Sequence, residues 1–121
     1  MEQIKLFDSE LKLMELIWPR FPISAKEISI LANEEIGWNK NTTYTILKKL
    51  VAKNALRRDE PDFICTPLIT KEQVQRDEAG TLINKLFDSS KKAFFSSFIG
   101  KEKLSKDEID ELKRIIEKHG E

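Results

Sequence analysis

The sequence predicts a mostly α-helical protein with one small β-hairpin. Apolar residues recur at helical spacing over residues 43–51, as in a helix packed on a core. The helix-starting pattern Ser/Thr-x-x-Glu/Gln occurs at Ser24, Thr70 and Ser105. Residues 55–66 contain two short extended runs separated by Asp, Glu and Pro, which is typical of a hairpin. We therefore expect helices on both sides of a small hairpin.

Length and composition suit a small folded protein. The chain has 121 residues, of which 40% are hydrophobic, enough for a core. We predict two domains, residues 1–69 and residues 70–121. Cys65 is the single cysteine and excludes an internal disulfide, and no apolar run reaches the length of a signal peptide or a membrane span. We expect a soluble, cytoplasmic protein.

Two helices are expected before residue 37. Asp8 is a candidate N-cap for a helix to about Trp18, ended by the prolines that follow. Its inward side is predicted to hold Phe7, Leu11, Met14, Ile17 and Trp18. Residues 21–23 read as a short extended piece. Ser24 then opens a second helix whose inward residues are Ala25, Ile28, Leu31 and Ala32.

A third helix follows after about four residues. Gly37 allows the chain to turn and Asn39 is placed to cap the helix, which gives helix-turn-helix spacing. Its predicted core side holds Thr43, Ile46, Leu47, Leu50 and Val51. Its other side holds hydrogen-bonding and cationic side chains together with one small residue, namely Asn41, Tyr44, Thr45, Lys48, Lys49 and Ala52.

Charge is concentrated around this third helix, although the net charge of the chain is zero. Residues 36–58 carry six basic side chains and no acidic one, whereas residues 1–35 carry four basic and seven acidic. A helix with a polar, positively charged face is what recognition of the DNA major groove requires. The alternative interpretation is a solvated helix face that binds nothing, and Tyr44 is equally consistent with packing at the helix flank.

The hairpin completes a recognisable order of elements. Asn54 tolerates the left-handed conformation at a helix end. Residues 55–58 and 63–66 are the expected strands, with Arg57 and Arg58 near the tip. Helix, strand, helix, helix, hairpin is the order of a winged helix. The candidate DNA-binding residues are Asn39, Lys40, Asn41, Thr42, Tyr44, Thr45, Lys48, Lys49, Arg57 and Arg58.

The remainder of the chain reads as three more helices. They start near Thr70, near Ala93 with an end at Gly100, and at Ser105. About fifty residues cannot bury three apolar stripes by themselves, and exposed apolar patches of this size mark partner surfaces. We therefore predict a helical dimerisation domain. Its candidate interface residues are Leu82, Leu86, Phe94, Phe95, Phe98, Ile109, Leu112 and Ile116.

Four stretches resemble the BlaI/MecI type of penicillinase and methicillin-resistance repressors. They are ELKLMELIWPR, GWNKNTTYTILKKLVAKNAL, FICTPLI and FFSSFIGKEKLSKDEIDELKRIIEK. The family pattern places a Trp, a capping residue and a Thr-x-x-Thr pair at the recognition helix, and Trp38, Asn39, Thr42 and Thr45 match it. The hairpin turn, Asp-Glu-Pro-Asp, is more acidic than a DNA-contacting wing normally is.

The resemblance implies a winged-helix repressor that binds a dyad operator DNA as a homodimer. It also implies release by proteolytic cleavage in the carboxyl-terminal domain, in a pathway with a membrane-bound sensor metalloprotease. The family's cleaved Asn-Phe bond aligns with Ser97 and Phe98, so Ser replaces Asn here. The alternative is that the phenylalanines are buried in the dimer and never cut. Operator, regulated genes and inducer stay open.

Other functional classes find little support in the sequence. A related copper-responsive branch ends in cysteine pairs, whereas Cys65 is alone and His119 is the only histidine, so we predict no metal site and no cofactor. Four acids at the start of the last helix, Asp107, Glu108, Asp110 and Glu111, are explained by capping and the helix dipole. With no catalytic motif we predict no enzyme. The alternative function is a winged-helix protein–protein interaction module.

Overall fold

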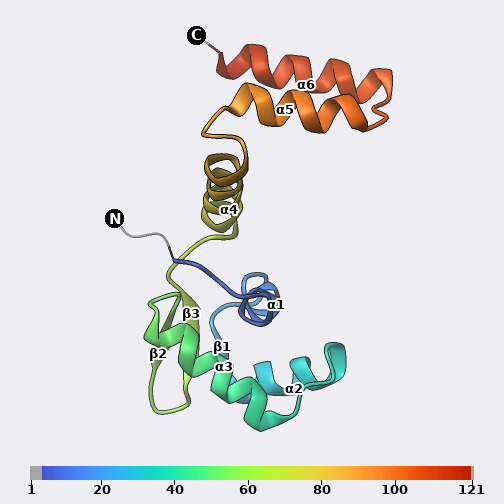
Figure 1. The fold of residues 1–121 in the computed structure, drawn as a ribbon. Helices are drawn as coiled ribbons and strands as arrows, with labels where there is room; N and C mark the ends of the chain where they lie inside the picture. Colours follow the sequence, from blue (N-terminus) through green and yellow to red (C-terminus); the bar gives the residue numbers. More distant parts are fainter. Residues whose placement is uncertain (1–3, 121) are drawn as a thin grey trace. The chain divides into compact units, whose positions relative to one another are not determined.

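The computed structural model describes residues 4–120 and forms six helices and one three-stranded sheet within them (Figure 1). The elements are α1 (Asp8–Ile17), β1 (Ile23–Ser24), α2 (Ala25–Glu35), α3 (Lys40–Ala52), β2 (Leu56–Asp59), β3 (Ile64–Pro67), α4 (Lys71–Leu86), α5 (Lys91–Lys101) and α6 (Lys106–His119). The order confirms the predicted fold class. Among these residues, no helix combines the length and apolar character needed to cross a lipid bilayer.

The chain divides into two compact units, Met1–Ala79 and Gly80–Glu121. The division falls inside α4, later than the boundary after residue 69 expected from the sequence. Val74, near the start of α4, explains the difference because it is buried with the core of the first unit. The first turns of α4 thus belong to the amino-terminal unit.

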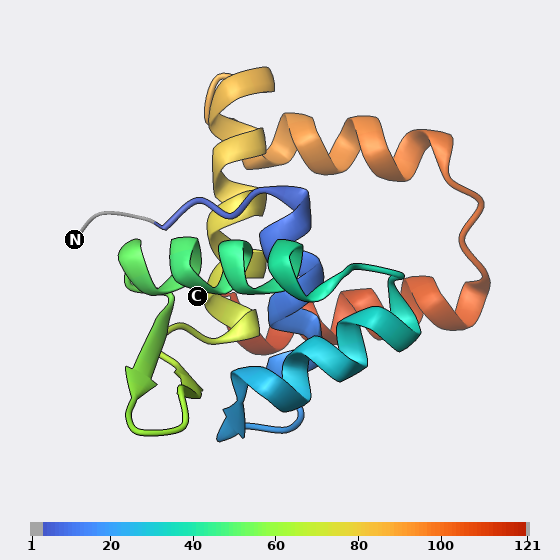
Figure 2. The same ribbon diagram turned by 90° about the horizontal axis from the view of Figure 1, so that it is seen from below.

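Helices α1, α2 and α3 enclose the core of the first unit, and Figure 2 shows α2 and α3 following each other through a short turn. The largest fully buried side chains come from all three helices and the hairpin, and they include Leu13, Met14, Ile17, Ile28, Leu47, Leu50 and Leu56. Gly37 lies in the turn with φ of 83°, and its N–H donates to the carbonyl of Ala32. The predicted helix-turn-helix is confirmed.

Strand β3 lies between β1 and β2, and both pairs are antiparallel. Cys65 is paired with Ile23 on one side and with Arg58 on the other. Each hairpin strand begins one residue later than predicted. The N–H of Ala55 donates to the carbonyl of Leu50 and so closes the end of α3 instead of joining the sheet. Phe63 has φ of 49° and belongs to the turn.

Most predicted helix starts are confirmed by hydrogen bonds. The side chains of Ser24, Asn39, Thr70 and Ser105 each accept a bond from the backbone N–H three residues later, at 2.8–3.1 Å. The first helix differs. Phe7 is its N-cap and Asp8 its first residue, so the predicted cap at Asp8 is wrong. The carboxylate of Glu10 instead accepts the N–H of Phe7 at 2.8 Å.

The buried face of α1 also differs from the prediction. Phe7 is 64% exposed, whereas Leu13 and Leu16 are buried although they were not assigned to the core. The buried stripe contains Glu10, Leu13, Met14 and Ile17, at i, i+3, i+4 and i+7. A charged residue occupies one position of this stripe, and for that reason the apolar pattern alone indicates a face rotated away from the true one.

In the second unit, α5 and α6 are joined by residues 102–105 and run in opposite directions (Figure 1). The expected helix end at Gly100 is wrong, because α5 continues to Lys101. A glycine is tolerated within the last turn of a helix at a modest entropic cost. The chain leaves helical geometry only at Glu102.

Candidate DNA-binding site

The polar face of α3 is open to solvent. Asn41, Thr42, Thr45, Lys48 and Lys49 are all exposed, while Thr43, Ile46, Leu47 and Leu50 on the opposite face are buried. The helix thus presents one continuous row of amide, hydroxyl and ammonium groups. The residues predicted to contact DNA from α3 are brought together on one surface, with Tyr44 half-buried at its edge.

Hydrogen bonds order the amino-terminal end of this surface. The side-chain oxygen of Asn39 accepts the N–H of Thr42 at 2.8 Å, so Asn39 serves as the helix cap. The hydroxyl of Thr45 donates to the carbonyl of Asn41 at 2.8 Å. This bond uses the only hydroxyl proton of Thr45, so the side chain offers a methyl group and an acceptor oxygen to a ligand.

Three of the six cations between residues 36 and 58 are engaged in ion pairs. Lys53, Arg57 and Arg58 are paired with Glu10, Asp59 and Glu60 respectively. Within residues 4–120, Lys40, Lys48 and Lys49 form no ion pair. Lys40 lies 5.6 Å from the ring centre of Tyr44, close enough for a cation–π contact. The charge available to an anion on α3 is therefore that of these three lysines.

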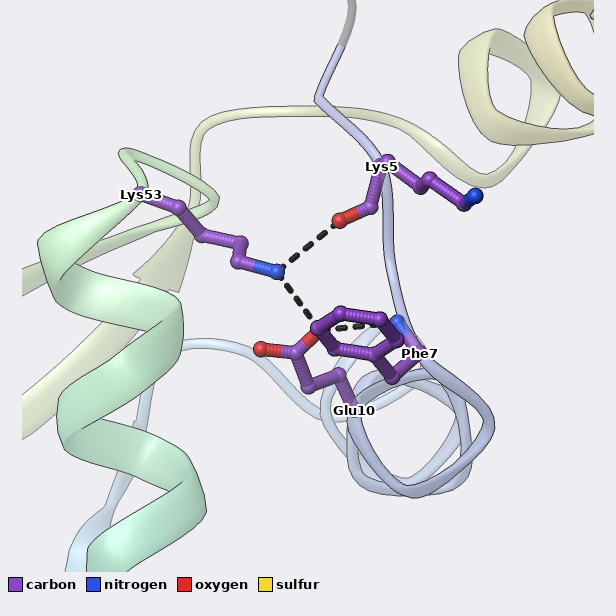
Figure 3. A network of polar contacts seen from close by, with 4 residues as sticks. All are labelled: Lys5, Phe7, Glu10 and Lys53. Atoms are coloured by element: carbon purple, nitrogen blue, oxygen red, sulfur yellow. Dashed lines mark hydrogen bonds and ion pairs between the residues drawn. The ribbon is translucent and has the colours of Figure 1, made fainter.

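Lys53 is turned away from the polar face into a contact with α1 (Figure 3). Its ammonium donates to the carbonyl of Lys5 at 2.9 Å and to Oε1 of Glu10 at 2.7 Å. It also lies 4.8 Å from the ring centre of Phe7. Lys53 thus ties the end of α3 to the start of the chain and contributes no free charge to the surface.

Tyr44 connects α3 with the hairpin. Its ring meets the ring of Phe63 edge to face at 5.9 Å between centres. The guanidinium of Arg58 lies over the ring of Phe63, at 3.7 Å from the ring centre. The hairpin is therefore connected to α3 by a series of aromatic and cation–π contacts.

The wing arginines, predicted to contact DNA, are both exposed and both paired with carboxylates of their own hairpin. Nε of Arg57 lies 3.0 Å from Oδ2 of Asp59. Nε of Arg58 donates to Oε2 of Glu60. Their DNA-binding role stays a prediction.

Comparison with known proteins identifies the family. Residues 6–118 match the penicillinase repressor family. The chain belongs to this family. The penicillinase repressor of Bacillus licheniformis is 26% identical over 117 residues, covering 95% of this chain and 91% of that protein. The methicillin resistance regulatory protein MecI of Staphylococcus aureus strain N315 is 26% identical over 116 residues, covering 94% of each.

A solved structure of the family supports the fold of the first unit. The solution structure of the DNA-binding domain of the repressor BlaI superposes with a TM-score of 0.55 at 29% identity. It covers 60% of this chain and 93% of that domain. The match confirms the winged-helix fold predicted from the order of elements.

Beyond the winged helix, the penicillinase repressor family match extends through the second unit, where apolar side chains are exposed. Leu82, Leu86, Phe95, Phe98, Ile109, Leu112 and Ile116 are each at least 39% exposed, as are Ile99 and Ile115. Phe94 is half-buried and its ring touches Phe87, Phe95 and Phe98. In the single chain the predicted interface residues on α4, α5 and α6 are thus exposed, apart from the half-buried Phe94.

The predicted cleavage residues Ser97 and Phe98 are exposed but lie within α5. A protease binds an extended backbone, so cutting there requires α5 to open locally. The nearest non-helical segment is residues 102–105.

Two features of this penicillinase repressor fold were missed from the sequence. Glu10 was not assigned a role, although a carboxylate on the buried stripe of α1 is a signal for a paired charge. Phe63 was placed in a strand, whereas its ring lies in the turn and contacts both Tyr44 and Arg58.

Within residues 4–120, no group of three or more His, Cys, Asp or Glu is able to hold a metal ion. Burial raises the pKa of the Cys65 thiol to about 11, against a smaller lowering by Arg58.

Proposed function

We propose that the protein is a DNA-binding transcriptional repressor that reads an operator with α3. The main support is the polar face of α3, an N-capped helix of the winged helix, which is exposed to solvent. Within residues 4–120, Lys40, Lys48 and Lys49 on this helix form no ion pair with a carboxylate. Membership of the penicillinase repressor family supports the same role. A repressor acts where the DNA is, so we place the protein in the cytoplasm.

Side chains near the start of α3 have the chemistry to read bases. Asn41 offers an amide, which matches the donor and acceptor pair of adenine in the major groove. Thr45 presents a methyl group and an acceptor, because its proton is held by the carbonyl of Asn41. Thr42 is exposed in the first turn, where the helix dipole favours an anion such as phosphate. Lys48 and Lys49, further along, would neutralise phosphates.

We further propose that residues 70–121 contain a dimerisation surface, which lies beyond the first turns of α4. Helix α6 carries an apolar stripe of Ile109, Leu112, Ile115 and Ile116 along one side, and each of these residues is exposed in the single chain. Covering this stripe with a second copy would remove a large apolar area from water. A homodimer with two winged helices would match an operator of dyad symmetry.

Cleavage at or near Ser97–Phe98 is the proposed way in which repression ends, in a pathway that includes a membrane-bound sensor metalloprotease. Such a cut would remove α6 and its apolar stripe while leaving the winged helix whole. Two linked DNA-binding heads gain about a hundredfold to ten-thousandfold in avidity through effective concentration. Loss of that link would release the operator without changing any contact to DNA.

In vitro selection tests the proposal directly, because it lets the protein choose its own operator. The full chain is incubated with a pool of random double-stranded DNA, and bound molecules are amplified and sequenced. We expect enrichment of one motif repeated with dyad symmetry, its half-sites about one helical turn or a multiple apart. A pool that stays random after repeated rounds at about 0.1 M salt, where nonspecific phosphate binding is weakened, would reject the repressor function.

A further inference from the structure

The wing carries more negative than positive charge. Residues 56–67 contain two basic residues, Arg57 and Arg58, and three acidic ones, Asp59, Glu60 and Asp62, so their net charge is minus one. A surface that approaches DNA normally gains affinity by neutralising phosphates with cations. The wing therefore has no excess positive charge with which to neutralise phosphates.

The pairing is systematic, since it uses both faces of β2. Successive side chains of a strand point to opposite faces, so Arg57 shares one face of β2 with Asp59, while Arg58 points to the other face and its partner Glu60 directly follows the strand. Nε of Arg57 is 3.0 Å from Asp59, and Nε of Arg58 is bonded to Glu60. Each arginine thus has a carboxylate partner two residues further along the chain.

Arg58 is also well placed for DNA. Its guanidinium lies on the ring of Phe63, which touches Tyr44 at the edge of the recognition surface. A cation held beside the helix face would meet the phosphates that flank the groove. A contact between Arg58 and a phosphate is opposed by the carboxylate of Glu60, which already accepts a hydrogen bond from the same guanidinium.

We propose that Asp59 and Glu60 limit the affinity of this protein for DNA by competing with phosphates for Arg57 and Arg58. The inference rests on the proposed function. Carboxylate and phosphate oxygens accept hydrogen bonds from the same guanidinium N–H groups. Each carboxylate also repels an approaching phosphate because both are negatively charged. Binding is then carried mainly by α3, and the wing adds little while its acids are present.

The variant Asp59→Asn/Glu60→Gln removes both competitors with almost no change in side-chain shape. Affinity of the full chain for its selected operator, measured by fluorescence anisotropy, should rise about 2- to 30-fold at low salt, which corresponds to releasing two exposed ion pairs. The dependence of log affinity on log salt should steepen by about one to two, because two more cations meet phosphates. The matched control is Glu111→Gln/Glu117→Gln on α6, which changes the net charge equally and should leave both quantities near their original values.

A second pair of variants tests whether Arg57 contributes to DNA affinity in the unmodified chain. Arg57→Gln alone should weaken binding less than about threefold, since its cation is already compensated. In the Asp59→Asn background the same substitution should abolish the gain made there. Arg57 is exposed and, within residues 4–120, stacks on no aromatic ring, so this pair tests the inference even if changes at Arg58 disturb the wing.

The inference and the proposed function fail in different ways. Unchanged or weaker binding by Asp59→Asn/Glu60→Gln overturns the inference, as does a large loss with Arg57→Gln alone. Lys48→Ala/Lys49→Ala, run beside them, reports on α3. If that variant loses affinity while the wing variants do nothing, the proposed function stands and the competition by Asp59 and Glu60 is rejected.

Discussion

The ammonium of Lys53, at the end of α3, lies 2.7 Å from Oε1 of Glu10, a carboxylate that is only 2% exposed (Figure 3). The same carboxylate oxygen accepts the backbone N–H of Phe7 at 2.8 Å, while Oε2 is buried without a partner. The pair joins residues 43 positions apart in the chain. It connects the carboxyl end of α3, the proposed recognition helix, to the start of α1.

Replacing Lys53 by Met should destabilise the protein markedly, because it leaves Glu10 buried without its counter-charge. Breaking a buried pair in this way costs about 3–5 kcal/mol. Lys53 is itself 27% exposed, so we expect about 2–3 kcal/mol here. Urea unfolding followed by circular dichroism measures the loss.

Two variants control for this result. Lys49→Met on the exposed face should change stability by less than about 0.5 kcal/mol. Glu10→Gln in the Lys53→Met background should recover part of the loss, since no buried charge then remains. A Lys53→Met protein as stable as the original would show that the ion pair between Lys53 and Glu10 does not contribute to the stability of the fold.

Leu112→Asp should dissociate the proposed dimer, because it would place a charge within a buried apolar interface. Sedimentation velocity at micromolar concentration should show a species of about half the original mass. Arg114→Asp introduces the same side chain on the opposite side of α6 and should leave the assembly intact. An undisturbed dimer in Leu112→Asp, or a monomeric original chain, would remove α6 from the proposed interface.

The fragment ending at Ser97 should fold as a winged helix but bind the operator much more weakly than the full chain. Loss of avidity is expected to cost about a hundredfold or more. Anisotropy with a full dyad operator and with a single half-site separates avidity from contact, since the two proteins should bind the half-site alike. Equal affinity for the full operator would exclude a cut at this position as the event that ends repression.

Local features of this fold were accessible from the sequence, and long-range ones were not. The cap at Asn39, the box at Ser105 and the left-handed Asn54 depend on residues within three or four positions, so spacing reveals them. The bond between Lys53 and Glu10 needs the tertiary fold. Its absence from the sequence prediction led to counting Lys53 among the free cations of the basic segment.

The same reasoning applies to the candidate DNA-binding site. Helical periodicity separated the exposed from the buried side of α3 correctly, because the two faces differ sharply in polarity. It could not show that the wing arginines are paired within the hairpin, although the acidic turn hinted at it. The helix expected to end at Gly100 already contained the Ser97–Phe98 bond, and only its end differs, because a glycine is compatible with both a helix end and a further helical residue and α5 continues to Lys101.

The role of α3 is tested most directly by a salt titration of operator binding. Lys48 and Lys49 are exposed and form no ion pair within residues 4–120, so replacing both with Ala should leave the fold unchanged. Each phosphate contact contributes about 0.9 to the slope of log affinity against log salt, so the slope should flatten by about one to two. Weaker binding with this flatter slope is the predicted result. An unchanged affinity and slope in a folded variant would contradict DNA recognition by α3.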